Sequence, residues 1–146
     1  MHTQTKSLDA KTIKKYSKKS ISQLKALATK HFNLFIRERD TDDNGFGRCI
    51  SSGQHLRIPS QLAHAGHFYI GAKYPELKFN EDNVHLQGKS DNYFNSGNLL
   101  DYRKNLINKI GLERVEELDR LGSISKRTLF KWDRLALIEV IEKYKK

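Results

Sequence analysis

The sequence has little cysteine, little proline and no long apolar run. Its single cysteine, Cys49, excludes an internal disulfide framework and any zinc site made of cysteines alone. No segment approaches the roughly 18 consecutive apolar residues of a membrane span, so we expect no membrane partner. The basic N-terminus has no apolar stretch behind it and does not predict a secretory signal, so a cytoplasmic location is the expectation.

Acidic residues are few relative to basic ones. Lys and Arg number 27 and Asp and Glu 17, which gives a formal charge of +10. Residues 1–30 hold eight lysines and one acid, so +7 of this charge lies there. Such a segment attracts polyanions by counterion release, and nucleic acid is the usual partner. A solvated tail without a partner is the alternative. We interpret residues 1–19 as a flexible basic arm whose DNA-binding lysines are Lys11, Lys14, Lys15, Lys18 and Lys19.

The spacing of apolar residues alternates between helical and strand periods. Ser20 and Gln23 have the spacing of a capping box, so a helix is predicted to begin there. The residues from Asp42 to Gly45 are turn formers that end it. Gly111 is predicted to stop a C-terminal helix. The expected strands are a hairpin over 46–58 and two strands over 67–70 and 84–86. The expected helices cover 20–37, 98–110, 115–121 (closed by Gly122) and 129–144, and a further helix is capped by Ser90.

These elements predict an α+β fold. An N-terminal helix and a helical C-terminal region, about 98–146, flank a small strand-containing core at about 46–97. At this length we expect one domain over 20–146, preceded by the basic arm.

The region 65–97 concentrates the side chains that can carry chemistry. His67 and His85 lie in the two predicted strands, and Asn and Asp residues fill the turn and the following helix. Carboxylate and amide oxygens suit a hard divalent cation, and a neutral histidine can take a proton from water. Together these groups could hydrolyse a phosphodiester. The alternative is structural: both histidines are partly buried strand residues, and the polar cluster forms turns and caps.

Several motifs resemble the NinG family of lambdoid phages. They are FIRERD (35–40), RCISSG (48–53), AGHF (65–68), LKFNEDNVHLQ (77–87) and DNYFNSGNLLDYRKNLINKIG (91–111), found in this order between about Phe35 and Leu121. That family is similar to the HNH, or ββα-metal, nucleases. The resemblance implies a small ββα-metal core and a divalent-metal-dependent endonuclease that cuts branched recombination intermediates such as Holliday junctions and D-loops. It also implies a phage or prophage origin, in a bacterial host.

The resemblance assigns roles residue by residue. His67 occupies the place of the general base, and Asn83 falls where the middle Asn of the HNH pattern orders the metal loop. His85 matches a further family position and joins this predicted catalytic set. Asn92 falls where the last residue of the pattern binds the metal, and Asp91 or His64 would complete a site for one Mg²⁺ or Mn²⁺. Arg103 and Lys104 are expected to hold phosphates.

The sequence also departs from the family pattern. Family members carry two C-x-x-C pairs that resemble a structural zinc knuckle; here they read Cys49-Ile50-Ser51-Ser52 and Gly88-Lys89-Ser90-Asp91. No structural zinc is therefore expected, although Cys49 with His55 and Asp91 could form a mixed site. His64 stands where the family pattern has Asp, and imidazole is a poorer ligand for Mg²⁺ than carboxylate.

Three functions are consistent with these observations. The first is a metal-dependent, structure-selective DNA endonuclease. The second is a DNA-binding module that kept the scaffold and lost the nuclease, as the missing cysteines and His64 suggest. The third is a basic protein-interaction domain without a DNA role. A resolvase-like task would favour a homodimer, because two strands must be cut symmetrically.

Overall fold

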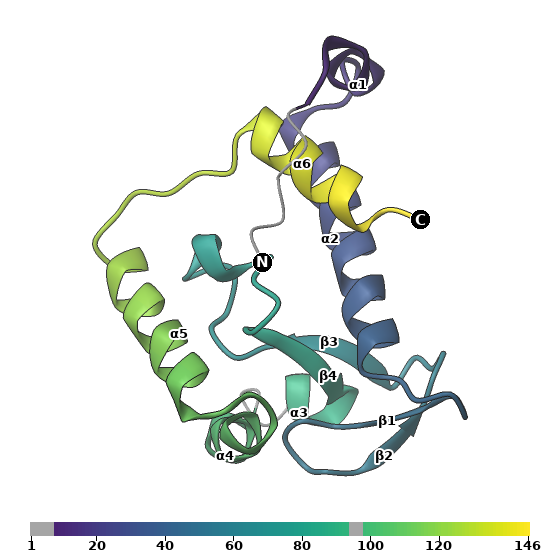
Figure 1. The fold of residues 1–146 in the computed structure, drawn as a ribbon, viewed down its shortest axis with the longest axis vertical. Helices are drawn as coiled ribbons and strands as arrows, with labels where there is room; N and C mark the ends of the chain where they lie inside the picture. Colours follow the sequence, from purple (N-terminus) through teal and green to yellow (C-terminus); the bar gives the residue numbers. More distant parts are fainter. Residues whose placement is uncertain (1–7, 94–97) are drawn as a thin grey trace. The chain divides into compact units, whose positions relative to one another are not determined.

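The computed structural model describes residues 8–93 and 98–146 and divides the chain into two compact units. Unit 1 combines Met1–Phe32 with Trp132–Lys146, and unit 2 is Asn33–Lys131 (Figure 1). This division differs from the predicted boundary after residue 19. Residues 1–7 of the predicted arm and 94–97 of the predicted core lie outside the described part. In that part no helix has the length and apolar character that crossing a bilayer requires.

Unit 1 is helical. It contains α1 (Ala10–Lys15), the first part of α2 (Ile21–Arg39) and α6 (Arg134–Tyr144). The predicted capping box is confirmed: the Ser20 amide donates to Gln23 Oε1 at 2.9 Å, and the Gln23 amide donates to Ser20 Oγ at 3.1 Å. Together these bonds satisfy two amides that the helix itself leaves unpaired.

The basic arm is more ordered than predicted. Asp9 caps α1 by accepting from the Thr12 amide at 2.8 Å, and Tyr16 after the helix is buried. The Tyr16 hydroxyl donates to Glu142 of α6 at 2.6 Å. The residues from Asp9 to Tyr16 therefore include a capped helix and a buried aromatic residue, whereas the prediction for them was a flexible arm. The five arm lysines are exposed.

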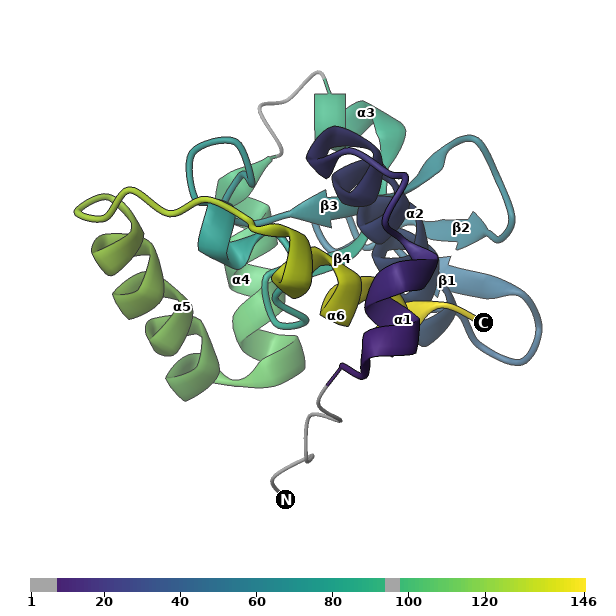
Figure 2. The same ribbon diagram turned by 90° about the horizontal axis from the view of Figure 1, so that it is seen from above.

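The described part of unit 2 contains two antiparallel strand pairs and three further α-helices (Figure 2). The predicted hairpin is confirmed, with Arg48 opposite His55 in its register. The second pair places His64 opposite Gln87 and His67 opposite Val84. The elements are β1 (Phe46–Arg48), β2 (His55–Arg57), β3 (Ala63–His67), η1 (Pro75–Leu77), β4 (Val84–Gly88), α3 (Lys89–Tyr93), α4 (Leu99–Ile110) and α5 (Leu112–Ser125).

The main core of unit 2 packs the strand region against α4 and α5. The two helices meet at Gly111, which ends α4 with a positive φ of 93° and confirms the predicted stop. Such a backbone conformation strains residues with a side chain. The Tyr102 hydroxyl donates to the Gly66 carbonyl at 2.7 Å and ties α4 to β3. The buried residues of this cluster are Ile50, Phe68, Leu77, Tyr102, Leu106, Val115 and Leu118.

Three predicted elements are displaced in the structure. The first strand of the second pair ends at His67 instead of starting there, because Phe68 turns into the α4–α5 core. Gly122 does not stop α5; it lies inside the helix, where an added Cβ would stand 3.1 Å from a Tyr69 ring carbon. Helix α6 begins only at Arg134, after Asp133 caps it, so the stretch from Leu129 to Trp132 is not helical.

A tight backbone approach at Gly66 generates a prediction about stability. A Cβ at this position would fall 2.0 Å from Gln87 Oε1 and 2.8 Å from Gln87 Cβ, and the second atom cannot move without moving β4. We expect Gly66→Ala to lower the free energy of unfolding by about 1–3 kcal/mol through overpacking. Urea unfolding measures this change. Gly88→Ala is the control, since its nearest heavy atom is 3.8 Å away; equal losses in both variants would contradict the prediction.

Candidate functional site

The predicted site residues lie on a continuous strand–strand–helix unit. Strand β3 ends at His67, β4 begins directly after Asn83, and α3 follows β4 without an intervening loop. Asn92 lies in α3. The loop between β3 and β4 is long and contains only the short helix η1. Hydrogen bonds to the loop backbone therefore determine its shape.

Asn83 holds this loop. Its side chain is completely buried, and its Oδ1 accepts from the Tyr69 amide at 2.8 Å. Its Nδ2 donates to the carbonyls of Tyr69 at 2.9 Å and of Leu77 at 3.0 Å. One amide group therefore satisfies both ends of the loop, which agrees with the loop-ordering role that the family resemblance implies.

His67 is held as a neutral base with a defined tautomer. Its Nε2 lies 2.9 Å from the Lys78 carbonyl oxygen, which can only accept a hydrogen bond. Nε2 therefore carries the proton, and Nδ1 carries the lone pair. Burial lowers the pKa of His67 below its ordinary value, and the Lys78 charge adds to this effect. The imidazole is thus unprotonated near neutral pH and able to accept a proton.

Two of the three predicted metal ligands meet. Asn92 Nδ2 lies 3.3 Å from His64 Nδ1, and the two side chains come from α3 and β3. Asp91 is engaged elsewhere: its Oδ2 accepts from the Cys49 thiol at 3.3 Å, and its Oδ1 accepts from Asn98 at 3.1 Å. A carboxylate is therefore missing from the pair that the structure assembles.

The general base and this ligand pair lie on different faces of the strand pair. Side chains alternate along a strand, so His64 and His67, three residues apart in β3, point to opposite faces. The face of His64 is also that of Gln87, its partner in the register. The predicted catalytic and metal residues therefore form two groups in this structure, rather than one cluster.

Hydrogen bonds connect three of the four residues at the positions that the resemblance assigns to the zinc knuckle, which are Cys49, Ser52, Gly88 and Asp91. Cys49 Sγ donates to Asp91 and accepts from the Gly88 amide at 3.2 Å, so three of the four positions meet. No three His, Cys, Asp or Glu side chains gather as metal ligands within residues 8–93 and 98–146. The alternative of a mixed site of Cys49, His55 and Asp91 is therefore wrong.

A buried charge network was missed by the sequence analysis. Asp40, at the end of α2, accepts from Arg39 Nε at 2.8 Å and lies 3.0 Å from Lys109 Nζ of α4. Its other oxygen accepts from the Leu86 amide of β4 at 2.9 Å. Burial alone would raise the pKa of this carboxyl. The hydrogen bond and charge of Arg39, the Lys109 charge and the Leu86 amide together lower it to about 2.

His85 belongs to this network rather than to an open site. Its Nε2 lies 2.8 Å from the Asp82 carbonyl, and its Nδ1 lies 2.8 Å from Lys109 Nζ and 3.0 Å from an Arg39 nitrogen. Burial and the two cations lower its pKa to about 4. Because its lone pair is occupied, His85 has no nitrogen free to act as a base. His85 therefore positions the side chains of Lys109 and Arg39 rather than acting as a base.

The predicted phosphate contacts differ in their surroundings. Arg103 makes two hydrogen bonds to the Asp119 carboxylate, at 2.9 and 2.8 Å, so its charge is already compensated. Lys104 is exposed on α4. The arm lysines belong to unit 1, and they are exposed on α1 and on the segment that follows it.

The fold and the site define a mixed α+β protein in which a strand–strand–helix unit carries His64, His67, His85 and Asn92. The chain matches the family described as Bacteriophage Lambda NinG protein over residues 2–146. It therefore belongs to the NinG family.

Relatives named "Protein ninG" match parts of the chain. That of Enterobacteria phage H19B is 46% identical over 87 residues, which are 60% of this chain and 40% of the relative. Those of Escherichia phage lambda and Salmonella phage P22 are 40% and 39% identical over 111 residues, which are 76% of this chain and 51% of each relative. The chain spans about half the length of the curated relatives it matches. No solved structure matches it.

The Asp40 network predicts a large effect of one neutral substitution. Asp40→Asn removes the anion that Arg39 and Lys109 share and leaves two cations beside a buried imidazole. We expect the free energy of unfolding to fall by about 3–5 kcal/mol, as measured by denaturant unfolding. Asp42→Asn in the exposed turn is the matched control and should cost about 1 kcal/mol or less. A similar loss in both variants would refute the assignment.

The low pKa of His85 predicts how stability depends on pH. The folded value is about 4, below the ordinary 6.5, so the unfolded chain binds more protons between these values. The contribution of neutral His85 to the free energy of unfolding is fully present above about pH 6.5 and is lost as the pH falls toward 4. For this shift the loss is about 3 kcal/mol.

The variant His85→Gln isolates this contribution. Glutamine can still accept and donate in the network but does not titrate, so its unfolding free energy should fall less steeply between pH 6.5 and 4. The His55→Gln variant, which removes an exposed histidine instead, is the control. Parallel curves for wild type and His85→Gln would contradict the prediction.

Proposed function

We propose that this protein is a divalent-metal-dependent, structure-selective DNA endonuclease that acts on branched recombination intermediates. The observation that carries the proposal is the state of His67: a neutral imidazole with Nδ1 unprotonated, at the mouth of a loop held by Asn83. The continuous β3–β4–α3 order supports an HNH-like assignment, as does membership of the NinG family.

In this proposal each residue has a defined task. His67 Nδ1 takes a proton from the attacking water, while its Nε2–H on the Lys78 carbonyl fixes the ring. Asn83 keeps the loop in place. His64, with Asn92 once its amide is turned, presents one nitrogen and one oxygen, a donor pair that suits Mn²⁺ better than Mg²⁺. When bound, the cation would offset charge on the leaving oxygen.

A second candidate is a DNA-binding module without nuclease activity. Two observations favour it: His67 lies on the opposite strand face from His64, and Asp91 is committed to Cys49. The net charge of +10 would still give salt-dependent DNA binding. The two candidates differ in whether the wild-type chain cleaves.

A cleavage assay on four-way junctions and linear duplexes tests the proposal. With Mn²⁺, Mg²⁺ or Ni²⁺ we expect the wild type to cut the branched substrate, and His67→Ala to reduce the rate by about 10²- to 10⁴-fold because the base is gone. Junction affinity should stay within about twofold, because the binding charges remain.

A conservative variant separates chemistry from structure. His67→Gln can still donate to the Lys78 carbonyl but has no basic nitrogen, so it should be as inactive as His67→Ala. Wild-type cleavage by either variant would refute the assignment of the base. Salt-dependent binding by a wild type that cuts no substrate with any of the three metals would establish the second candidate instead.

A further inference from the structure

The β1–β2 hairpin has one buried and one exposed face. Gly47 and Leu56 are buried, whereas the flanking residues of both strands are exposed. The register pairs Phe46 with Arg57 and Arg48 with His55, so these four side chains share the exposed face. The face therefore combines two guanidinium groups, an imidazole and a large apolar ring, of which Phe46 is 40% exposed.

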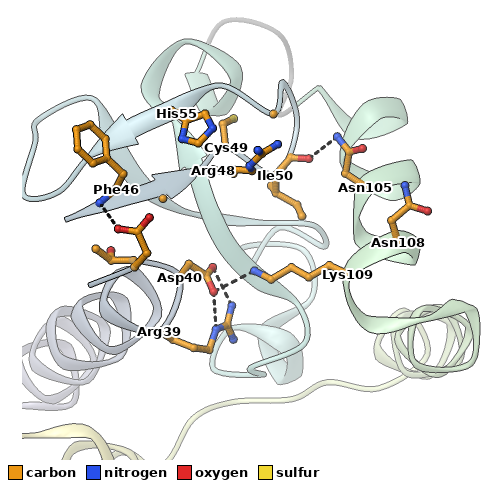
Figure 3. Close-up of a pocket in the computed structure, with 14 residues that line it drawn as sticks. Arg39, Asp40, Phe46, Arg48, Cys49, Ile50, His55, Asn105, Asn108 and Lys109 are labelled. Carbon is orange, nitrogen blue, oxygen red and sulfur yellow. Dashed lines mark hydrogen bonds and ion pairs between the residues drawn. The ribbon is translucent and has the colours of Figure 1, made fainter. Parts of the chain in front are cut away.

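A cavity of about 640 Å³ adjoins this face (Figure 3). The hairpin supplies Phe46, Arg48 and His55 to its lining, and α4 supplies amide side chains and a lysine from the other side. Cavities of about 300–1,000 Å³ accommodate small ligands, so this one has room for a nucleotide. The residues contributed by α4 are Asn105, Asn108 and Lys109.

The charges of this region are unequally compensated. The two acids that line the cavity differ: Arg39 and Lys109 compensate the charge of Asp40, whereas the exposed Asp42 carboxylate accepts only from the backbone amides of Asn44 and Phe46. Neither Arg48 nor Arg57 has a hydrogen-bond or ion-pair partner among the residues that the structure describes. The exposed hairpin face therefore carries positive charge for which residues 8–93 and 98–146 provide no counter-ion.

We infer that the hairpin face (Phe46, Arg48, His55 and Arg57) and the adjoining cavity bind an unpaired, single-stranded segment of DNA. Guanidinium groups hold phosphates, and exposed aromatic rings stack on bases that have left the duplex. Asn108 on the opposite wall offers both a donor and an acceptor to a base edge. The inference rests on the proposed function only in taking DNA as the partner, and it does not depend on cleavage.

Fluorescence anisotropy of the full chain tests the inference in EDTA, where no metal-dependent cleavage occurs. The probes are a labelled oligothymidine and a duplex of the same length. We expect R48Q/R57Q to weaken oligothymidine binding by about tenfold or more at moderate salt. The slope of log affinity against log salt should fall by about 1.4, the value for two phosphate contacts on a single strand.

Two further variants make the result specific. F46L should weaken oligothymidine binding by about tenfold and leave duplex binding within about twofold, because only unpaired bases stack on the ring. K73Q/R127Q removes the same charge from exposed positions outside the hairpin and should keep oligothymidine affinity within about twofold. Circular dichroism of each variant confirms that it is folded.

The outcomes distinguish this inference from the proposed function. Loss of oligothymidine binding confined to the hairpin variants supports it, even if the wild type cuts no substrate. If K73Q/R127Q lost as much oligothymidine affinity as R48Q/R57Q, the effect would come from net charge alone, and the inference would be overturned. Wild-type binding unaffected by R48Q/R57Q and F46L, or no oligothymidine binding at low salt, would also overturn it.

Discussion

The packing of unit 2 depends on the hydrogen bonds and ion pairs of the Asp40 carboxylate. This carboxylate accepts from Arg39, Lys109 and the Leu86 amide, so one buried anion joins the end of α2, strand β4 and helix α4. Without it, two cations would stand against the buried ring of His85, at a cost comparable with the total stability of a small domain. The strand pair that carries the candidate site is therefore held by a specific charge arrangement as well as by apolar packing.

The parts of the fold that the sequence predicted correctly depend on local signals. The capping box at Ser20 and Gln23 and the stop at Gly111 involve residues within one turn of each other. The predicted position of strand β3 was wrong. The small residues of β3 have no marked strand preference, whereas the aromatic Phe68 after it has one, so the prediction placed the strand too late in the sequence. Its true position is set by pairing with β4, where Gly66 allows the Gln87 side chain to approach.

Only some residues of the candidate site were singled out from the sequence. His67 and Asn83 were singled out through the family resemblance, and the structure provides a tautomer for one and a loop-ordering role for the other. Asp40 was not singled out from the sequence, because its partner Leu86 is 46 residues away. No local pattern announces such a contact. Lys109 was missed for the same reason, since its spacing indicates only an exposed helix face.

The residues that replace the zinc-knuckle cysteines affect which ligands remain for the proposed catalytic cation. A hydrogen bond from Cys49 to Asp91 now joins the positions that the family resemblance assigns to zinc ligands, and Asn105 donates to the Ile50 carbonyl at 2.8 Å. These bonds attach the hairpin to α3 and α4, and the first of them occupies the carboxylate of Asp91, next to Asn92. On the proposed function, the remaining ligands of the catalytic cation must come from water and DNA phosphates. Metal binding would then be coupled to substrate binding, and a weak affinity for the cation alone follows from the donor set.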